Sequence, residues 1–159
     1  LDSIQDGNIG DWDRMIDTNV KGLLYVSKSA IPLLDIDNGA HIINLGSIAG
    51  KEVYPNGNVY CATKHAVDAL TKAMRIDLLP KGIKVTSIDP GMVETEFSEV
   101  RFHGDKERAK SVYNGVQPLT GIDIAETILF VITRPAHVNI NDLLIMPTAQ
   151  ATGTIVNRN

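Results

Sequence analysis

The sequence predicts an α/β fold in which helices cover both faces of a small parallel sheet. Three strands are predicted, at residues 40–45, 83–88 and 142–146, and the first is a nearly continuous apolar run of the kind found in strands buried on both faces. Segments with helical spacing of apolar residues precede each strand, and this alternation favours right-handed crossovers between parallel strands. No internal repeat, low-complexity tract or linker divides residues 1–159, so we expect one domain.

The first predicted helix covers residues 11–34, with Gly10 or Asp11 as its N-cap. Apolar side chains recur through it at helical spacing. Asn19 falls within this apolar stripe, where a carboxamide must find hydrogen-bond partners or cost free energy. It is either a satisfied core side chain that bends the helix, with Gly22 helping, or a side chain that positions a water or a lysine.

Two more helices are predicted, over residues 58–79 and 121–133. Small side chains line one face of the first, which suits close packing against the sheet or another subunit. Thr120 and Asp123 resemble a capping box at the start of the second. Its expected core face consists of Ala125, Ile128, Leu129 and Ile132. Residues 96–118 are charged and irregular, and we expect one or two short helices there, over the strand ends.

Composition and charge exclude several classes of partner and site. The net charge is −4 and no basic patch is present, so we expect no nucleic-acid partner. No apolar run approaches the length of a membrane span, and no basic-then-apolar leader is seen. Cys61 is the only cysteine, which indicates a reducing, cytoplasmic compartment and a small packed side chain. The four histidines lack metal-ligand spacing, so we expect no metal site.

The strongest chemical pattern runs from Asn44 to Lys64. Ser47 follows a predicted strand at its carboxyl end, where open α/β sheets place their ligands. Tyr60 and Lys64 are four residues apart, so on a helix they share one face. We expect the ammonium to favour the phenolate; a fall of roughly three units from a pKa of about 10 corresponds to about 4 kcal/mol. For this spacing alone, an ordinary amphipathic pair is the commoner explanation.

A second candidate segment runs from Asp89 to Thr95, directly after the predicted strand at 83–88. Pro90 fixes its own φ, and Gly91 lets the backbone approach a ligand closely. Exposed backbone amides and the threonine hydroxyl in this segment suit a carboxamide or a phosphate. Taken alone, Pro-Gly after a strand is usually a turn.

Four motifs together resemble those of the classical short-chain dehydrogenases/reductases. They are Asn19-Val20-Lys21-Gly22, Gly46-Ser47-Ile48-Ala49-Gly50, Tyr60-Cys61-Ala62-Thr63-Lys64 and Pro90-Gly91-Met92-Val93-Glu94-Thr95. Their order and intervals match the family, so the combination is far more specific than any one motif. The resemblance implies a Rossmann-type doubly wound parallel sheet, of which this chain holds the C-terminal half only, with about three strands and their flanking helices.

The resemblance also implies roles for individual residues. The catalytic set is Asn19, Ser47, Tyr60 and Lys64. The nicotinamide cofactor is held by Asn19, Tyr60, Lys64, Pro90, Gly91, Val93 and Thr95. Tyr60 acts as general acid/base, while Lys64 lowers its pKa and holds the nicotinamide ribose. Ser47 orients the substrate oxygen, and Asn19 holds a water that links the lysine to solvent.

Three further segments resemble the NADP-dependent 3-hydroxy acid dehydrogenases. They are residues 94–98, 100–105 and 134–141. The resemblance implies NADP as cofactor, with serine, allo-threonine or a related 3-hydroxy acid as substrate and malonic semialdehyde in the reverse sense. Such a substrate is anionic, so we expect Arg101 to bind its carboxylate while Ser47 and Tyr60 bind its hydroxyl. A solvated surface arginine is the alternative for Arg101.

One part of the family pattern is not found in residues 1–159. It comprises the glycine-rich turn Thr-Gly-x-x-x-Gly-x-Gly, which cradles the pyrophosphate, and the later motif Asn-Asn-Ala-Gly. We therefore expect a partial domain that lacks the N-terminal dinucleotide-binding half. We also expect the strand at 40–45 to be an unpaired sheet edge, and this chain alone to show no measurable binding of NADPH.

Two other functions are open on the sequence. One is reduction of a 3-oxoacyl thioester or a general carbonyl compound, and the other is a non-catalytic α/β association module. The intact set of Asn19, Ser47, Tyr60 and Lys64 opposes the second. The family resemblance further implies a homotetramer, and we expect the polar residues 147–159 to dock on a neighbouring subunit.

Overall fold

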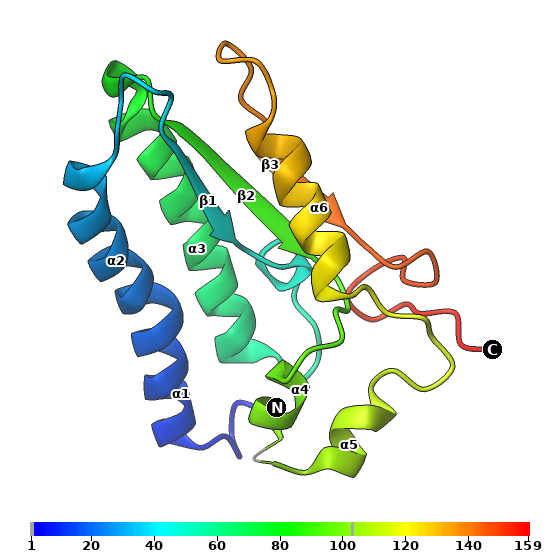
Figure 1. The fold of residues 1–159 in the computed structure, drawn as a ribbon. Coiled ribbons are helices and arrows are strands. Elements are labelled where there is room, and N and C mark those ends of the chain that lie inside the picture. The colour runs from blue at the N-terminus through cyan, green and yellow to red at the C-terminus, as the bar shows by residue number, and fades with distance from the viewer. Residues whose placement is uncertain (1, 103) are drawn as a thin grey trace.

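The computed structural model describes residues 2–102 and 104–159. Its centre is a sheet of three parallel strands, β1 (His41–Leu45), β2 (Lys84–Pro90) and β3 (Asp142–Ile145), in the order β1-β2-β3 (Figure 1). The register pairs Leu45 with Ile88 and Pro90 with Ile145, so the carboxyl ends of all three strands lie at one edge. The predicted parallel sheet of about three strands is confirmed.

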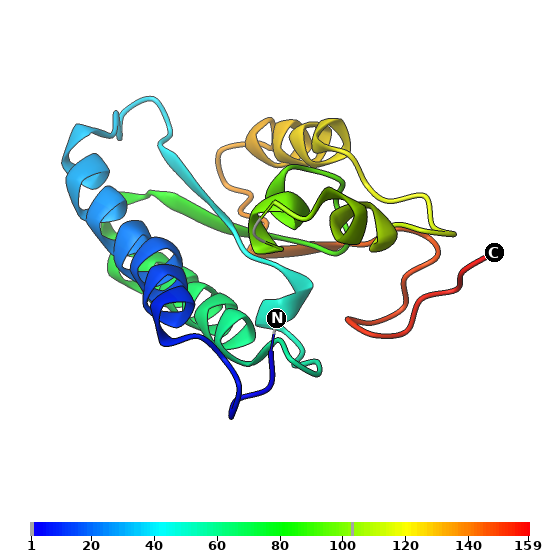
Figure 2. The same cartoon turned by 90° about the horizontal axis from the view of Figure 1, so that it is seen from below.

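Helices cover both faces of this sheet. Their bounds are α1 (Ile9–Ile16), α2 (Leu23–Ala30), α3 (Asn58–Asp77), α4 (Phe97–Arg101), α5 (Lys106–Ser111) and α6 (Gly121–Ile132). The first three lie on one face and α6 lies on the other (Figure 2). The short helices α4 and α5 follow β2, as expected for the charged, irregular segment.

The core is divided into two clusters by the sheet. Met74 of α3 and Leu78, directly after this helix, pack with Val85 of β2 on one side. Ile124 and Val131 of α6 pack with Ile88 of β2 on the other. Because successive side chains of a strand point to opposite faces, Val85 and Ile88 serve different clusters, and neither is exposed to solvent. Polar side chains of the same strand, Thr86 and Ser87, are also fully buried, so both faces of β2 are covered.

The helix expected over residues 11–34 is interrupted. Between α1 and α2 the chain forms a π-helical turn, Asp17–Gly22, and a 3-10 turn, Ile31–Leu33, ends the second helix. Asn8, not Gly10 or Asp11, is the N-cap, and its side chain accepts from the backbone N–H of Asp11 at 3.1 Å. Apolar spacing predicts helix but does not distinguish hydrogen bonds to the fifth residue from those to the fourth. A π turn commonly marks a functional site, and this one contains Asn19.

Helix α6 turns to the core a face that shares only Ile128 with the one expected. Ile124 and Val131 are buried, whereas Leu129 and Ile132 are about half exposed, at 57% and 47%. The helix is apolar almost all round, so periodicity alone does not determine which stripe faces the sheet. The start of the helix follows its prediction, because Thr120 and Asp123 form a complete capping box.

The outer edge of β1 has no partner strand among the described residues. Leu45, at the end of this strand, is 54% exposed. Tyr25, Val26 and Leu33, on α2 and the turn after it, are also exposed. The expectation of an open edge at this strand is therefore met in the described part of the chain. No helix in that part is long and apolar enough to cross a membrane.

His41, at the start of β1, provides a test of how the sheet is held together. Its Nε2 lies 2.8 Å from Thr86 Oγ1, and that hydroxyl donates to the carbonyl of Ile140 at 2.6 Å. The imidazole therefore donates from Nε2, which leaves Nδ1 buried with no hydrogen-bond partner among the described groups. Burial, with a smaller contribution from the charge of Lys84, lowers the pKa of His41.

We predict that stability falls on acidification because of this histidine. With a folded pKa below the unfolded value of about 6.5, its contribution is complete above that pH and decreases as pH falls toward the folded pKa. Urea unfolding between pH 7.5 and 5 measures the slope, and His41→Gln should flatten it. His137→Gln, at an exposed histidine, is the matched control; equal slopes in all three proteins would contradict the prediction.

Candidate active site

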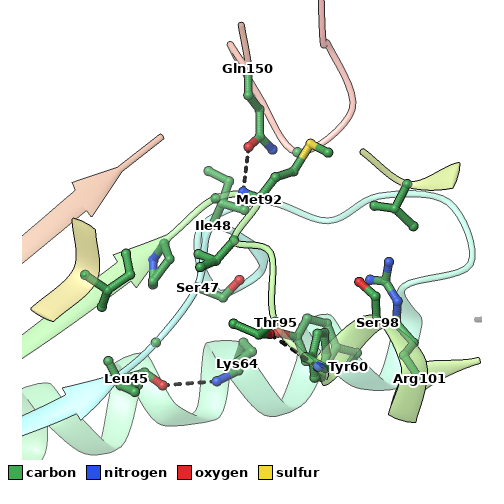
Figure 3. Close-up of a pocket in the computed structure, with 18 of the residues that line it drawn as sticks. Leu45, Ser47, Ile48, Tyr60, Lys64, Met92, Thr95, Ser98, Arg101 and Gln150 are labelled. Carbon is green, nitrogen blue, oxygen red and sulfur yellow. Dashed lines mark hydrogen bonds between the residues drawn. The ribbon is translucent and has the colours of Figure 1, made fainter. Parts of the chain in front are cut away.

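A cavity of about 800 Å³ opens at the carboxyl edge of the sheet, against the start of α3. All nine residues singled out from the sequence line it. They are Asn19, Ser47, Tyr60, Lys64, Pro90, Gly91, Val93, Thr95 and Arg101. Figure 3 shows Ser47 above the helix that carries Tyr60 and Lys64. Segments far apart in the chain thus contribute to one hollow, while the roles of these residues stay predictions.

The turn after β1 holds Ser47 between the sheet and α3. Its hydroxyl accepts from the backbone N–H of Ala49 at 3.1 Å and caps a short 3-10 turn, Ile48–Gly50. The two flanking glycines are required by close packing. A Cβ at Gly46 would lie 1.9 Å from a carboxylate oxygen of Asp89, and one at Gly50 would lie 2.7 Å from the carbonyl oxygen of Lys64. The spacing of the Gly-Ser-x-x-Gly motif therefore has a local steric cause.

Lys64 ties α3 to the end of the first strand. Its ammonium donates to the carbonyl of Leu45 at 3.0 Å (Figure 3). Burial lowers the pKa of Lys64, and the charge of Asp89 acts in the opposite direction. The lysine has no carboxylate within ion-pair distance among the described residues.

Tyr60 differs from its prediction in one respect. We expected Lys64 to bring the pKa of the phenol down, but burial raises the pKa of Tyr60, with the hydroxyl of Ser47 and the charge of Arg101 opposing the rise. Burial has the largest effect, and the Tyr60 ring lies 5.6 Å from the Phe97 ring centroid, while the Lys64 ammonium donates to the carbonyl of Leu45. In this state the phenol is held neutral.

Asn19 reaches α3 from the π-helical turn. Its Nδ2 donates to Thr63 Oγ1 at 3.0 Å, and that hydroxyl donates to the carbonyl of Tyr60 at 2.8 Å. The amide donor therefore has a partner, as expected of a core side chain, and Asn19 also lines the cavity. That it positions a water or a lysine stays a prediction. One threonine, buried between Tyr60 and Lys64, connects the two helices at this point.

The segment after β2 is fixed by contacts from three sides. Gly91 donates to the carbonyl of Ile145, and Met92 donates to the side-chain oxygen of Gln150, both at 2.8 Å. Glu94 donates to the carbonyl of Leu119 at 2.8 Å. The Pro-Gly step is thus more than a turn, because its backbone is clamped at the edge of the cavity.

Arg101 projects from α4 into the same cavity. Its guanidinium lies 5.6 Å and 4.9 Å from the ring centroids of Phe97 and Phe102. It forms no ion pair with a carboxylate in residues 2–102 and 104–159, and its Nε is buried without a hydrogen-bond partner there. A cation held by aromatic rings and left without a counter-ion is available to an anionic ligand.

The C-terminal residues add a wall that was not foreseen. Gln150, Gly153, Thr154, Val156 and Arg158 line the cavity. The tail lies against its own chain: the Gly153 N–H donates to Glu52 at 2.7 Å, and Arg158 donates to the carbonyls of Val112 and Asn114. That it also docks on a neighbouring subunit stays a prediction. The tail has no helical or strand periodicity, so only the polarity of Gln150 and Arg158 hinted at such contacts.

The comparisons with known proteins agree with the motifs. A sequence profile described as short chain dehydrogenase matches residues 2–106, which is well over half of the chain. The chain belongs to the short-chain dehydrogenase family. The prediction of this family from the four motifs is confirmed.

Short-chain dehydrogenases of known activity are among the chain's relatives. It is 47% identical over 149 residues to the NADP-dependent 3-hydroxy acid dehydrogenase of Schizosaccharomyces pombe, covering 94% of this chain and 58% of that protein. It is also 47% identical over 148 residues to sulfoacetaldehyde reductase 2 of Chromohalobacter salexigens, covering 92% and 59%. The chain thus spans about three fifths of the length of these curated relatives.

A solved structure supports the same placement. The closed form of serine dehydrogenase complexed with NADP+ superposes with a TM-score of 0.92 at 43% identity, covering 100% of this chain and 65% of that one. The predicted fold, part of a doubly wound Rossmann-type sheet, is confirmed by this similarity and by the strand order. No cluster of His, Cys, Asp and Glu able to hold a metal ion occurs among the described residues.

We predict that Gly46→Ala destabilises the fold by about 1–3 kcal/mol, the usual cost of overpacking a closed site. The added methyl group would collide with Asp89, whose carboxylate is 1% exposed and cannot swing into solvent. Urea unfolding measures the change. Gly121→Ala is the control, because a Cβ there meets no atom within 4 Å. Equal stability of the two variants would contradict the prediction and show that the turn after β1 can shift to accommodate the methyl group.

Proposed function

We propose that this chain forms the substrate side of an NADP-dependent oxidoreductase that exchanges a hydride with a small 3-hydroxy acid such as serine or allo-threonine. The same site acts on malonic semialdehyde in the reverse sense. The observation that supports this most is the convergence of Ser47, Tyr60 and Lys64 on one cavity at the carboxyl edge of a parallel sheet. The S. pombe relative and the serine dehydrogenase structure support the same substrate class.

The residues present fit the nicotinamide end of NADP. Lys64 has donors left after its bond to Leu45, and Thr95 Oγ1 accepts only from the N–H of Phe97, so its hydroxyl hydrogen is available. We assign the ribose to Tyr60 and Lys64 with Asn19 behind them, and the carboxamide to the segment Pro90–Thr95, including Gly91, Val93 and Thr95. When bound, NADP accepts or supplies the hydride.

Tyr60 is the proton-transfer group in this proposal. In the oxidation direction its phenolate takes the proton of the substrate hydroxyl, and in reduction its phenol returns it. Burial opposes the phenolate, so a nearby cation is required, and Lys64 is four residues along the same helix face. Ser47 Oγ hydrogen-bonds the reacting oxygen and orients it toward Tyr60. Asn19, braced by Thr63, supports a water that carries the proton on to solvent.

Arg101 recognises the anionic end of the substrate. Its guanidinium has no protein counter-ion among the described residues and borders the same cavity as Tyr60 and Ser47. A carboxylate accepts two parallel hydrogen bonds from such a group. A sulfonate is also an acceptor for it, and a relative at 47% identity is a sulfoacetaldehyde reductase, so reduction of a sulfonated aldehyde is the second candidate.

Assembly and domain extent are part of the proposal. Residues 1–159 constitute the part of the family domain that follows its dinucleotide-binding half, and the complete enzyme is a cytoplasmic homotetramer. Exposed apolar side chains on α2 and α6, such as Tyr25, Val26 and Leu129, support burial against further protein surface. Sedimentation equilibrium of a chain that includes the dinucleotide-binding half measures the oligomeric state. A monomer would contradict the proposed tetramer.

Tyr60→Phe is the direct test of the chemistry. We expect it to lower kcat at least about 100-fold, because the only group removed is the proton-transfer hydroxyl. The assay uses a chimaera that joins the glycine-rich half of the S. pombe relative to this chain, and it follows NADPH absorbance with serine, malonic semialdehyde and sulfoacetaldehyde. Tyr25→Phe, at a tyrosine that is 67% exposed, is the control. A chimaera that binds NADPH but turns over none of the three substrates would contradict the proposed function.

Arg101→Ala tests the substrate class in the same chimaera. Loss of hydrogen bonds to a charged group costs about 1.5–3 kcal/mol, so KM for the anionic substrate should rise about 10- to 100-fold. Turnover of a neutral carbonyl compound should be unaffected. Arg108→Ala is the matched control, because Arg108 also lies over the Phe102 ring, at 4.4 Å, but does not line the cavity. An unchanged KM for the acid would exclude Arg101 from substrate binding.

A further inference from the structure

A cluster of charged side chains lies behind the serine turn and is not used by the proposed reaction. Lys51, directly after the Ile48–Gly50 turn, directs its Nζ at three carboxylates. These are Asp68 of α3 at 2.5 Å, Asp89 of β2 at 3.3 Å and Asp142 of β3 at 3.7 Å. The cluster therefore joins the turn, the long helix and two strands.

Asp89 is the buried member of this cluster. Its side chain is 1% exposed, against 14% for Asp68 and 35% for Asp142. Ser87 Oγ donates to one of its carboxylate oxygens at 2.7 Å. The other oxygen has no hydrogen bond and faces only the Lys51 ammonium at 3.3 Å. A carboxylate this deep is costly unless cations compensate it, so its charge acts over a longer range than that of an exposed acid.

Lys64 lies on the far side of the peptide against which Asp89 packs. Its ammonium donates to the carbonyl of Leu45, and the next residue, Gly46, is the one whose missing Cβ makes room for the Asp89 carboxylate. Gly46 is itself hydrogen-bonded to β2 through the carbonyl of Ile88 at 2.8 Å. The buried carboxylate is thus positioned between two lysines, one bonded to it and one behind a single peptide unit.

We propose that Asp89 is a positioning residue that keeps Lys64 in its charged form, and that Lys51 limits how strongly Asp89 does so. The proposal rests on the catalytic role given to Lys64. A lysine that loses its proton cannot stabilise the Tyr60 phenolate. Without that phenolate, the site has no group to take the proton of the substrate hydroxyl. The buried acid compensates the charge of Lys64, which has no carboxylate within ion-pair distance among the described residues.

Other charged or titratable groups lie around these two side chains, on α3, on β3 and, for Arg101 at the cavity, on α4. From α3 they are Tyr60, which is neutral, and Asp68, which is neutralised by Lys51 and Lys72 at 2.5 Å and 2.6 Å. Asp142 on β3 is partly solvated and shared with Arg75. Asp89 alone is buried and near Lys64, in agreement with burial lowering the pKa of Lys64 and the charge of Asp89 opposing that change.

An NMR titration of the chain labelled with 15N at the lysine Nζ atoms tests the proposal. Lys64→Arg identifies the resonance of Lys64. We expect Asp89→Asn, which keeps the shape and can keep the bond from Ser87, to shift the titration of Lys64 to lower pH. We expect Lys51→Gln to shift it to higher pH, because a competing cation is removed. Asp142→Asn, which also removes a partner of Lys51, is the control and should leave Lys64 unchanged.

The two shifts of opposite sign make the outcome decisive. An unmoved resonance in Asp89→Asn, or a downward shift in Lys51→Gln, would overturn the proposal. If Asp89→Asn fails to fold by circular dichroism, the sign of the Lys51→Gln shift still decides. The titration needs no substrate or cofactor, so its result is separate from the activity assays: Lys64 can respond as expected in a protein with no dehydrogenase activity, and an active enzyme can show no response.

Discussion

The hydrogen bond from the Lys64 ammonium to the carbonyl of Leu45 is the contact on which the arrangement of the cavity depends. It joins the second turn of α3 to the last residue of β1, and the serine turn is packed between these two elements. The parallel register then brings the segments after β2 and β3 to the same edge. Lys64 therefore links a helix to a strand and also supplies a charged group. Its position is fixed by the fold without a bound ligand.

Much of the fold was predictable because burial leaves a simple signature. Val85 and Ile88 belong to opposite clusters, so apolar residues occur on both faces of their strand, and the capping box at Thr120 and Asp123 is a purely local motif. The predictions that were wrong concern choices made by tertiary contacts. Helix α6 is apolar on nearly all sides, and only packing against β2 selects the stripe that includes Ile124 and Val131. The π turn around Asn19 is likewise invisible to a pattern that repeats every three to four residues.

The candidate site likewise has features that local sequence patterns predict and features that depend on tertiary contacts. Motif order was sufficient to single out residues that border the cavity, because most of them stand just after a strand or on the first turns of α3. The pKa shifts of the site residues could not be predicted from motif order. A spacing of four residues suggested that Lys64 acts on Tyr60, but burial of the phenol and the competing carbonyl of Leu45 are properties of the packed state. The wall formed by Gln150 and Arg158 was missed for a related reason, since irregular chain carries no periodic signal.

The π-helical turn has a consequence for how this helix could have arisen. A turn of this kind contains one residue more than the α-helical turn it replaces, which rotates everything after it by about 100° relative to what came before. Removing a single residue from Asp17–Gly22 would let α1 and α2 merge into one continuous rod. It would also swing the apolar stripe of one half out of line with the other and take Asn19 away from Thr63. The irregularity is thus the register adjustment that lets one long helix serve both the core and the cavity.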